Sequence, residues 1–503
     1  MKKVFNKLYI LVIALGLLAT ACADLEVINE NSPDAERALA NPEDVQALAG
    51  GAFRTWHNQV QEYEGTSLAM GTMGDYITCS WGNSAMRDMS WEPRINAFNN
   101  NLTYAYFPII RSQWQYSYSP IASVNLVLQR LYDGMDFGGA DQNALTEAWC
   151  YFVSGAAHGY LGLVFDQANI IPWDADIGAL ELKPWDEVVA AGIALLDEAI
   201  SIANSTSFTI PPNWVGGQTM DNNDLAALAS AYAARIMAYQ SRTKAHNEAL
   251  NWGQILTYAQ NGHDFDFAPE LGGNYGFYDD YWVYARYPGW GRVDMRIINE
   301  MDWDYPSRWP NSGVWPSGET FYGPASADQD ARIESDFEYL ASNAFPPDRG
   351  YYHFSHYRHS RYDYVSAEVW YGNKPMPSFL AWEVKLLEAE ALYRTGNVAG
   401  AVSILNDPTG PRKVRGGCVD VNQATDDVLK LILDEKDIEC FLTGGGIGYY
   451  DMRRTDRLQP ATLLHFPVPA TELEISGLEH YTINAVADGV DGSAGDWSGY
   501  DTK

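Results

Sequence analysis

The fold class of this 503-residue chain follows from the stretch Glu388-Ala389-Glu390-Ala391-Leu392-Tyr393-Arg394-Thr395-Gly396-Asn397. Small and aromatic side chains recur in it three to four residues apart, which is the spacing of one helix face. A Gly-Asn turn ends the stretch, and a second short helical pattern follows with Ala401 and Leu405. Two short helices joined by a tight turn are typical of a tetratricopeptide helix pair.

The same helical period recurs along the rest of the chain. Residues 226–262 repeat the pair, and residues 158–199 repeat it with a longer loop. The spacing is irregular, which excludes a uniform solenoid of about 34-residue repeats. The expected helices cover residues 41–56, 120–132, 143–163, 185–203, 223–241, 252–261, 378–394, 398–406 and 426–442. The sequence therefore predicts an all-α, mainly helical fold built of tetratricopeptide-like helix pairs.

Two long stretches with little helical period interrupt these pairs, at residues 65–103 and 262–371. The whole chain has 17 Trp and 32 Tyr, more than a core of this size needs, and these two stretches hold much of the surplus. Loops of this length inside a compact domain are usually functional. We therefore expect long, irregular, aromatic-rich insertions on the helical scaffold, and we expect a ligand to bind there.

The N-terminus has the pattern of a bacterial lipoprotein signal. Three lysines precede an apolar run at residues 8–18, and small residues then lead to Cys22. The run is too short to cross roughly 30 Å of hydrocarbon as a helix, so it indicates a secretory signal over residues 1–21. Cys22 would then be the lipidated first residue of the mature chain, and a secreted chain with a chance cysteine is the alternative. No second membrane-spanning stretch is expected, which leaves the lipid as the membrane attachment.

The charge balance excludes some classes of partner. The chain has 65 acidic residues against 33 Lys and Arg, a net charge of −32. Removing the signal deletes three lysines and no acid, so the mature charge is −35. Nucleic acid is not expected as a partner because phosphate binding needs a basic surface. Anionic lipid and anionic glycans are disfavoured for the same electrostatic reason.

The remaining cysteines give no ligand spacing for a structural zinc ion. Cys150 and Cys440 lie in apolar helical patterns and are expected to be buried thiols. Whether Cys79 and Cys418 form a disulfide stays open, because their spacing in the sequence does not decide it.

Several motifs together give the chain a resemblance to the SusD/RagB family of outer-membrane lipoproteins. The most specific are C-terminal, and they include Asp451-Met452-Arg453-Arg454 and Phe466-Pro467-Val468-Pro469 as well as the helix pair quoted above. The other matching segments are residues 24–29, 41–45, 50–53, 184–188, 196–200, 435–436 and 441–445.

The resemblance implies a tetratricopeptide-containing helical fold at the cell surface, with a lipid anchor at Cys22. It also implies a lid-like partnership with a TonB-dependent (SusC-like) outer-membrane transporter, and the capture of glycans without hydrolysis. On this basis residues 22–340 form an N-terminal region with the helical repeats and the ligand-binding insertions. Residues 341–503 form the C-terminal SusD/RagB region, and the two regions make one compact unit. Some members of the family handle peptides or other nutrients, so the resemblance does not fix the ligand.

The candidate ligand-binding residues combine aromatic rings with amide and carboxylate groups. Rings of Trp and Tyr cover the C–H face of a sugar, while Asn, Asp, Gln and Arg bind its hydroxyl groups. Trp81 with Asn83 is the leading candidate, because the family commonly places ligand contacts in this region. Packing of a long loop against the helices is the alternative for each aromatic residue. The further candidates are Asp75 and Tyr76 in the first insertion and Trp290, Trp303, Trp315 and Tyr322 in the second.

Other motifs are assigned structural roles. His353, His356 and His359 recur every third residue without a helical zinc motif or a nearby carboxylate, so packing is expected and a metal is not. Residues 444–448 lack the lysine of a phosphate loop and are expected to form a helix end and a turn. Asp451, with Arg453 and Arg454, is expected to tie that turn to the helices through ion pairs.

The sequence thus predicts a binding protein without cofactor. Acid pairs such as Asp279-Asp280 could suggest a glycoside hydrolase, but chance pairs are expected among so many acids, and the motifs of nucleophilic or zinc hydrolases are absent. A secreted glycoside hydrolase and a helical scaffold that binds only proteins remain the alternatives outside the nutrient-binding class.

Overall fold

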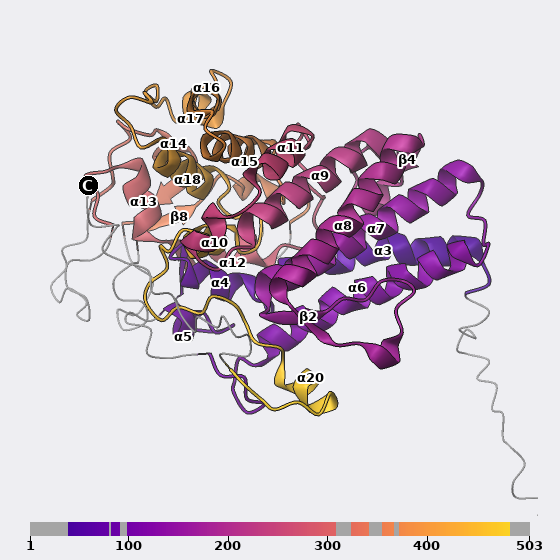
Figure 1. Ribbon diagram of the computed structural model, residues 1–503. Coiled ribbons are helices and arrows are strands. Elements are labelled where there is room, and N and C mark those ends of the chain that lie inside the picture. Colours follow the sequence, from indigo (N-terminus) through magenta and orange to yellow (C-terminus); the bar gives the residue numbers. More distant parts are fainter. Residues whose placement is uncertain are drawn as a thin grey trace, which may run out of the picture. The chain divides into compact units, whose positions relative to one another are not determined.

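The structure is a computed structural model (Figure 1) and describes residues 39–79, 82–90, 98–307, 323–341, 355–366 and 372–482. The chain divides into two units, Met1–Val45 and Gln46–Lys503. The predicted signal and Cys22 lie outside the described residues, and the account below concerns the second unit.

Four long helices pack in chain order and form the first half of this unit (Figure 1). They are α6 (Pro108–Tyr132), α7 (Ala140–Val164), α8 (Trp185–Ser205) and α9 (Asn222–Tyr239). The next helices pack back onto α9 and onto one another. These are α10 (Lys244–Glu248), α11 (Trp252–Gln260), α15 (Ala381–Arg394), α16 (Val398–Leu405), α18 (Val428–Glu439) and α19 (Ile447–Arg454). The last part of the chain also contains α17 (Pro411–Val414) and α20 (Ala470–Ile475). The prediction of a mainly helical fold of paired helices is confirmed.

Glycines allow the closest of these helix contacts, between α7 and α8. A Cβ atom on Gly192 would lie 2.6 Å from the backbone nitrogen of Gly159, and a Cβ atom on Gly155 would lie 2.8 Å from the carbonyl oxygen of Gly192. No side chain fits at such distances. The run of small residues in α7 therefore brings the two backbones into direct contact.

Helix α8 is, within the described residues, the one helix long and apolar enough to cross a membrane by length and composition. From the sequence, no such second stretch is expected. Here α8 packs along α7 and α9, as a core helix of a globular unit does.

Pro120 lies inside α6, although the sequence analysis expected a helix to begin there. Proline removes one intrahelical hydrogen bond and costs about 3 kcal/mol in a helix interior. The carbonyl that loses its donor belongs to Tyr116, which is half exposed and therefore accessible to water. Ile110, Trp114 and Ile121 continue one buried face across the proline. Their burial outweighs the local cost, and the helix starts twelve residues earlier than expected.

The two insertions contain short helices and strands that the sequence did not predict. The first insertion holds α4 (Ser67–Met73), β1 (Ile77–Cys79) and α5 (Met86–Ser90). The second holds α12 (Asp280–Arg286), β6 (Gly291–Val293), α13 (Met295–Met301), α14 (Arg332–Ser335), β7 (Phe337–Tyr339) and β8 (Tyr357–His359). Strand β1 pairs antiparallel with β6, with Ile77 opposite Val293. This pairing joins the two insertions side by side.

Three further antiparallel pairs of short strands are present. Strands β7 and β8 pair within the second insertion, and the other two pairs hold loops of the helical part. Those pairs are β2 (Gln167–Asn169) with β3 (Leu182–Pro184), and β4 (Thr209–Ile210) with β5 (Met220–Asp221).

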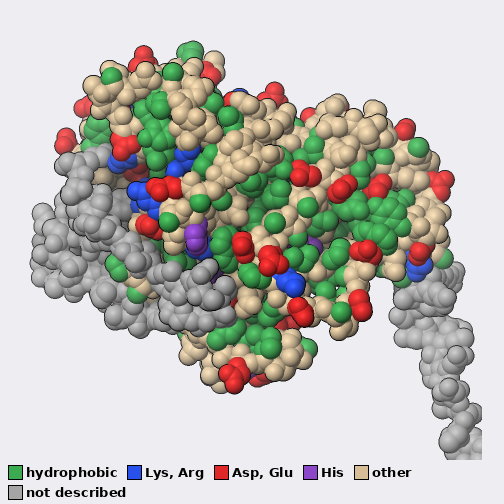
Figure 2. Space-filling model, viewed as in Figure 1, with side chains coloured by type: hydrophobic (Ala, Val, Ile, Leu, Met, Phe, Trp, Pro, Cys, Tyr) green, Lys and Arg blue, Asp and Glu red, His purple; other side chains and the backbone are tan. Residues whose placement is uncertain are grey.

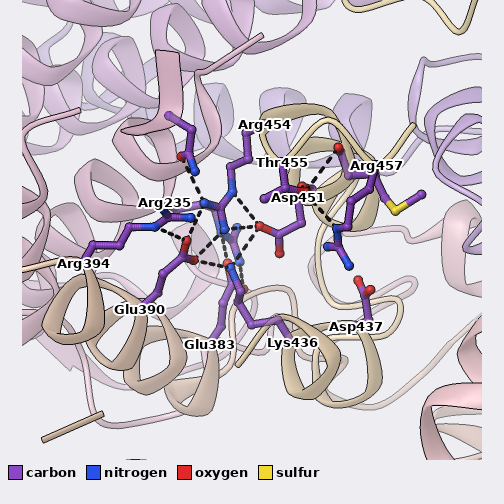
Figure 3. A network of polar contacts seen from close by, with 12 residues as sticks. Arg235, Glu383, Glu390, Arg394, Lys436, Asp437, Asp451, Arg454, Thr455 and Arg457 are labelled. Atoms are coloured by element: carbon purple, nitrogen blue, oxygen red, sulfur yellow. Dashed lines mark hydrogen bonds and ion pairs between the residues drawn. The ribbon is translucent and has the colours of Figure 1, made fainter. Parts of the chain in front are cut away.

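A buried ionic network ties the C-terminal motifs together (Figure 3). Glu390, from the stretch quoted first, accepts hydrogen bonds from Arg454 Nη1 at 2.7 Å, from Arg454 Nη2 at 2.6 Å and from Lys436 Nζ at 2.9 Å. Arg394 Nε donates to the same carboxylate at 2.8 Å. Lys436 also pairs with Asp451 at 3.0 Å, and Asp451 pairs with Arg454. We call this set the Glu390 network.

The predicted ion pairs around Asp451 are therefore confirmed for Arg454. Arg453 behaves differently, because its guanidinium donates to the backbone carbonyls of Leu163, Leu464 and Tyr239. The expected helix end and turn at residues 444–448 are also found, since α18 ends at Glu439 and α19 begins at Ile447.

Three cysteines and two of the clustered histidines lie in the interior. Cys150, Cys418 and Cys440 are free, buried thiols, so Cys418 forms no disulfide and the prediction for the other two is confirmed. His356 and His359 are buried, and burial lowers the pKa of both. Within the described residues no group of three or more His, Cys, Asp or Glu side chains is arranged to hold a metal ion. His353 lies outside these residues.

Candidate ligand-binding site

The end of helix α3 (Pro42–Val60) meets the start of α12, and this junction brings the second insertion onto the helical scaffold. The carbonyl of Gln61 accepts hydrogen bonds from the backbone N–H groups of Asp280 at 3.1 Å and Tyr281 at 3.0 Å. The Gln61 amide donates to the Asp279 carboxylate at 3.2 Å. Asp279 also caps α12 by accepting from the backbone N–H of Trp282 at 2.7 Å. The junction thus fixes the first turn of α12 on α3.

Four aromatic side chains gather beside this junction, and we call them the α12 aromatic cluster. They are Tyr63, Tyr284, Tyr287 and Trp290. The ring centroids lie 6.0 Å apart for Tyr63 and Tyr284, 5.4 Å for Tyr284 and Trp290, and 4.8 Å for Tyr287 and Trp290. Tyr284 is buried, whereas the other three rings are partly exposed. The cluster therefore combines a fixed centre with accessible ring surface.

Asn83 links the first insertion to this cluster. Its amide nitrogen donates to the hydroxyl of Tyr63, and its amide oxygen accepts from the hydroxyl of Tyr284 at 2.5 Å. The neighbouring Ser84 hydroxyl donates to the carbonyl of Tyr63 at 2.7 Å. One amide thus holds two phenol hydroxyls, one from the segment just before the first insertion and one from the second insertion, and Asn83 itself stays partly exposed.

Two carboxyl groups border the cluster and interact with each other. Burial is the main reason why the pKa of Glu62 rises to about 7, and the adjacent Asp280 raises it further through charge and a side-chain hydrogen bond. The pKa of Asp280 is raised as well, again mainly by burial. Burial raises the pKa of the neighbouring Asp279 to about 8. Since two adjacent carboxylates repel each other, the Glu62–Asp280 pair holds a proton near neutral pH.

The structure brings together two of the predicted site residues, Asn83 and Trp290. Trp303 lies just after α13 and is half exposed, and its backbone N–H donates to Gln329 at 3.0 Å. Trp81, Trp315 and Tyr322 lie outside the described residues.

Asp75 and Tyr76 lie in the interior. The Asp75 carboxylate accepts from the Gln459 amide at 3.0 and 3.1 Å, and the Tyr76 hydroxyl donates to the carbonyl of Asp437 at 2.7 Å. The Tyr76 ring stacks on Phe441 with centroids 4.4 Å apart. Both side chains are at most 2% exposed, so they present no surface to a ligand and hold the core together instead.

Sequence reasoning missed Tyr63, Tyr284 and the Glu62–Asp280 pair. Glu62 and Tyr63 come before residue 65, where the first insertion is expected to begin, and they lie just after the end of α3. A usable signal was present in the second insertion, where Asp279 precedes several aromatic residues at helical spacing and so marks a capped, ring-bearing helix.

Solved structures similar to this one share its fold along most of the chain. A SusD superfamily protein from Bacteroides vulgatus has 15% sequence identity and a TM-score of 0.59, with 87% of this chain and 97% of that chain covered. A SusD-like carbohydrate-binding protein from the same species has 15% identity and a TM-score of 0.56, with 82% and 83% covered. Surface glycan-binding protein A from Bacteroides uniformis has 17% identity and a TM-score of 0.57, with 87% and 98% covered. No family model and no curated protein matches the chain. At these identities the likeness shows the fold, and the SusD-type fold expected from the motifs is confirmed.

Proposed function

We propose that this chain, which has the fold of SusD superfamily proteins, is a non-catalytic surface lipoprotein that binds glycans. In this proposal it is anchored to the outer membrane through Cys22 and passes its ligand to a TonB-dependent (SusC-like) transporter. The anchor and the transporter come from the signal pattern and the family resemblance. The glycan comes from the chemistry of the α12 aromatic cluster.

The observation that carries the glycan proposal is the contact between Asn83 and the ring pair of Tyr63 and Tyr284. A sugar needs a flat apolar surface for its C–H face and donors and acceptors for its hydroxyls. Trp290 and Tyr287 offer partly exposed rings. Asn83, which is bonded to two other rings of the cluster, and Glu62, which precedes Tyr63 in the chain, offer partly exposed polar groups. Because the hydroxyls of both tyrosines are held by one amide, the rings are oriented before a ligand arrives, and less ordering entropy is lost on binding.

The charge of the protein favours a neutral glycan. On the face shown in Figure 2, acidic side chains are spread over the helices, while Lys and Arg are few and gathered in places. The net charge of the whole chain is −32. An anionic polysaccharide would approach against this field.

The carboxyl pair beside the cluster does not favour hydrolysis. Glycosidases hold their two carboxyl groups about 5 to 9.5 Å apart, so that a sugar or a water molecule fits between them. Glu62 and Asp280 share a side-chain hydrogen bond, which leaves no such space. We assign the pair to the α3–α12 junction and to hydroxyl binding.

The proposal is tested by affinity electrophoresis of the mature chain in gels that contain xyloglucan, galactomannan, arabinoxylan, amylopectin, laminarin or levan. We expect at least one neutral polysaccharide to retard the protein, and Trp290→Ala to abolish the retardation. Trp303→Ala is the matched control, since it removes a half-exposed tryptophan of the same insertion.

Three outcomes would contradict the proposal. Loss of binding in Trp303→Ala with full binding in Trp290→Ala would place the site elsewhere. Release of reducing ends from the bound polysaccharide would indicate a glycoside hydrolase. Binding of a peptide mixture with no binding of any polysaccharide would indicate the peptide-binding alternative.

A further inference from the structure

A groove of about 710 Å³ runs along helix α6. None of its lining residues belongs to the α12 aromatic cluster. Helix α6 forms its floor, the segment after β2 forms one wall, and α20 contributes Glu472. The volume lies within the range of small-molecule binding sites. Glu472 is the one acidic or basic side chain among the lining residues that the structure describes.

The wall next to α6 is fixed by hydrogen bonds to the floor. The hydroxyl of Tyr118 accepts from the backbone N–H of Asn169 at 2.7 Å and donates to the carbonyl of the same residue at 2.9 Å. The amide of Asn125 donates to the carbonyl of Ile171 at 2.8 Å. Trp114 packs beside Tyr118 with ring centroids 5.0 Å apart. These contacts fix the shape of the groove.

Trp173 supplies a partly exposed ring on the same wall. Its ring packs on Tyr132 with centroids 4.5 Å apart. The Tyr132 hydroxyl donates to Glu147 at 2.6 Å and lies 2.9 Å from the hydroxyl of Tyr151 on α7. These contacts hold the Trp173 ring in place as a platform.

Several amide side chains line the groove. Gln115, Asn125 and Gln129 of α6 lie on the helix face that also carries Tyr118, since positions 115, 118, 125 and 129 follow one another at intervals of three, seven and four residues. Within the described part of the chain, no hydrogen bond involves the side-chain amide of Gln115, of Gln129 or of Asn169 on the facing wall.

We propose that this groove is a second carbohydrate-binding site, which takes a neutral oligosaccharide. Rings on the floor and wall suit the C–H faces of sugars, and unpaired amides suit their hydroxyls. A single carboxylate accepts hydroxyl donors but repels an anionic ligand. An amphipathic helix of a partner protein would need an unbroken apolar stripe, which the amides interrupt.

The inference takes its ligand class from the proposed function, but it shares no residue with the α12 aromatic cluster. Two sites on one protein would hold a long glycan at two points. Binding at the second point is then intramolecular, which raises the overall affinity without any new contact at the first.

Hydrogen exchange followed by mass spectrometry tests the groove and the cluster separately. The mature chain is incubated with maltoheptaose, cellohexaose, xylohexaose, mannohexaose or laminarihexaose. We expect one of these probes to slow exchange in peptides covering residues 112–132 and 169–181. Slower exchange in residues 280–291 reports the α12 aromatic cluster in the same experiment.

The double variant Gln115→Ala, Gln129→Ala provides the matched perturbation. Both side chains are exposed and make no internal hydrogen bond, so the fold and the melting temperature should not change. Loss of two hydrogen bonds should raise the Kd for the protection of residues 112–132 by about fivefold or more. Gln260→Ala, an exposed glutamine at the end of α11, should leave that Kd unchanged.

The outcomes separate this inference from the proposed function. Protection of residues 280–291 alone would overturn glycan binding in the groove and support glycan binding at the α12 aromatic cluster. Protection of the groove peptides alone would support binding in the groove and contradict binding at the cluster. Groove protection that the double variant does not weaken would overturn the inference. So would protection by a tryptic casein digest when none of the five oligosaccharides protects the groove.

Discussion

Replacing Glu390 by glutamine should destabilise the protein much more than the same change at Glu388 on the same helix, α15. The Glu390 carboxylate is fully buried and accepts from Arg454, Lys436 and Arg394. Burial opposes its ionisation, but Arg454 and Lys436 overcome that effect and hold its pKa well below the ordinary value. Glutamine keeps the shape, removes the charge and turns one acceptor into a donor that faces cations.

The expected cost is about 3–5 kcal/mol, which is the usual range when one partner of a buried ion pair is removed. Unfolding entropy is about 2.1 cal/mol/K per residue, so a unit of about 460 residues should lose about 3–5 °C in melting temperature. The depressed pKa means that the stabilisation is complete at neutral pH and is lost as the pH falls below the ordinary glutamate value of 4.5. The difference between wild type and variant should shrink over that acid range.

The assay is urea unfolding followed by far-ultraviolet circular dichroism, with a thermal melt on the same samples. Glu388→Gln is the matched control, since it makes the same change two residues earlier on α15. Glu388 pairs with Lys385, whose side chain is 51% exposed, and such pairs contribute less than about 1 kcal/mol. Equal shifts for the two variants would refute the structural role assigned to the Glu390 network.

Two further predictions concern the carboxyl pair and the closest helix contact. The pKa of Glu62 is raised to about 7 in the folded protein, so the folded protein keeps a proton that the unfolded protein loses above about pH 4.5. The free energy of unfolding should therefore fall as the pH rises from about 4.5 to about 7. Glu62→Gln should make the urea midpoint less dependent on pH over that window, and an unchanged dependence would show that Glu62 and Asp280 do not share a proton. Gly192→Ala should cost about 1–3 kcal/mol in urea unfolding, because its Cβ would lie 2.6 Å from the Gly159 nitrogen. Gly273→Ala, with open space around its Cβ, is the control, and equal midpoints would contradict the close packing of α7 on α8.

Most of the helical scaffold could be predicted because each helix buries one periodic face. The small residues of α7 and the Gly-Asn turn after α15 are local signals, and they gave the helix pairs to within a few residues. The helix start expected at Pro120 was wrong. Proline is unfavourable inside a helix, but the apolar face of α6 continues across this proline. Tertiary burial decided that competition.

The short helices and strands of the insertions were harder to predict because they form through contacts with residues far away in the sequence. Strand β1 pairs with β6 across more than 200 residues, and no local pattern specifies that pairing. Composition pointed correctly to aromatic-rich segments, but it does not reveal which way a side chain faces. Asp75 and Tyr76 have the residue types of a sugar site and lie in the core, whereas Asn83 lies at the ring cluster.

The most direct test of the account is a calorimetric titration of the mature chain and its Trp290→Ala variant. The titrant is an oligosaccharide of the neutral polysaccharide that retards the wild type. The account predicts saturable binding by the wild type and at least a tenfold weaker Kd for the variant, which corresponds to about 1.4 kcal/mol. An unchanged Kd for Trp290→Ala would contradict glycan binding at the α12 aromatic cluster.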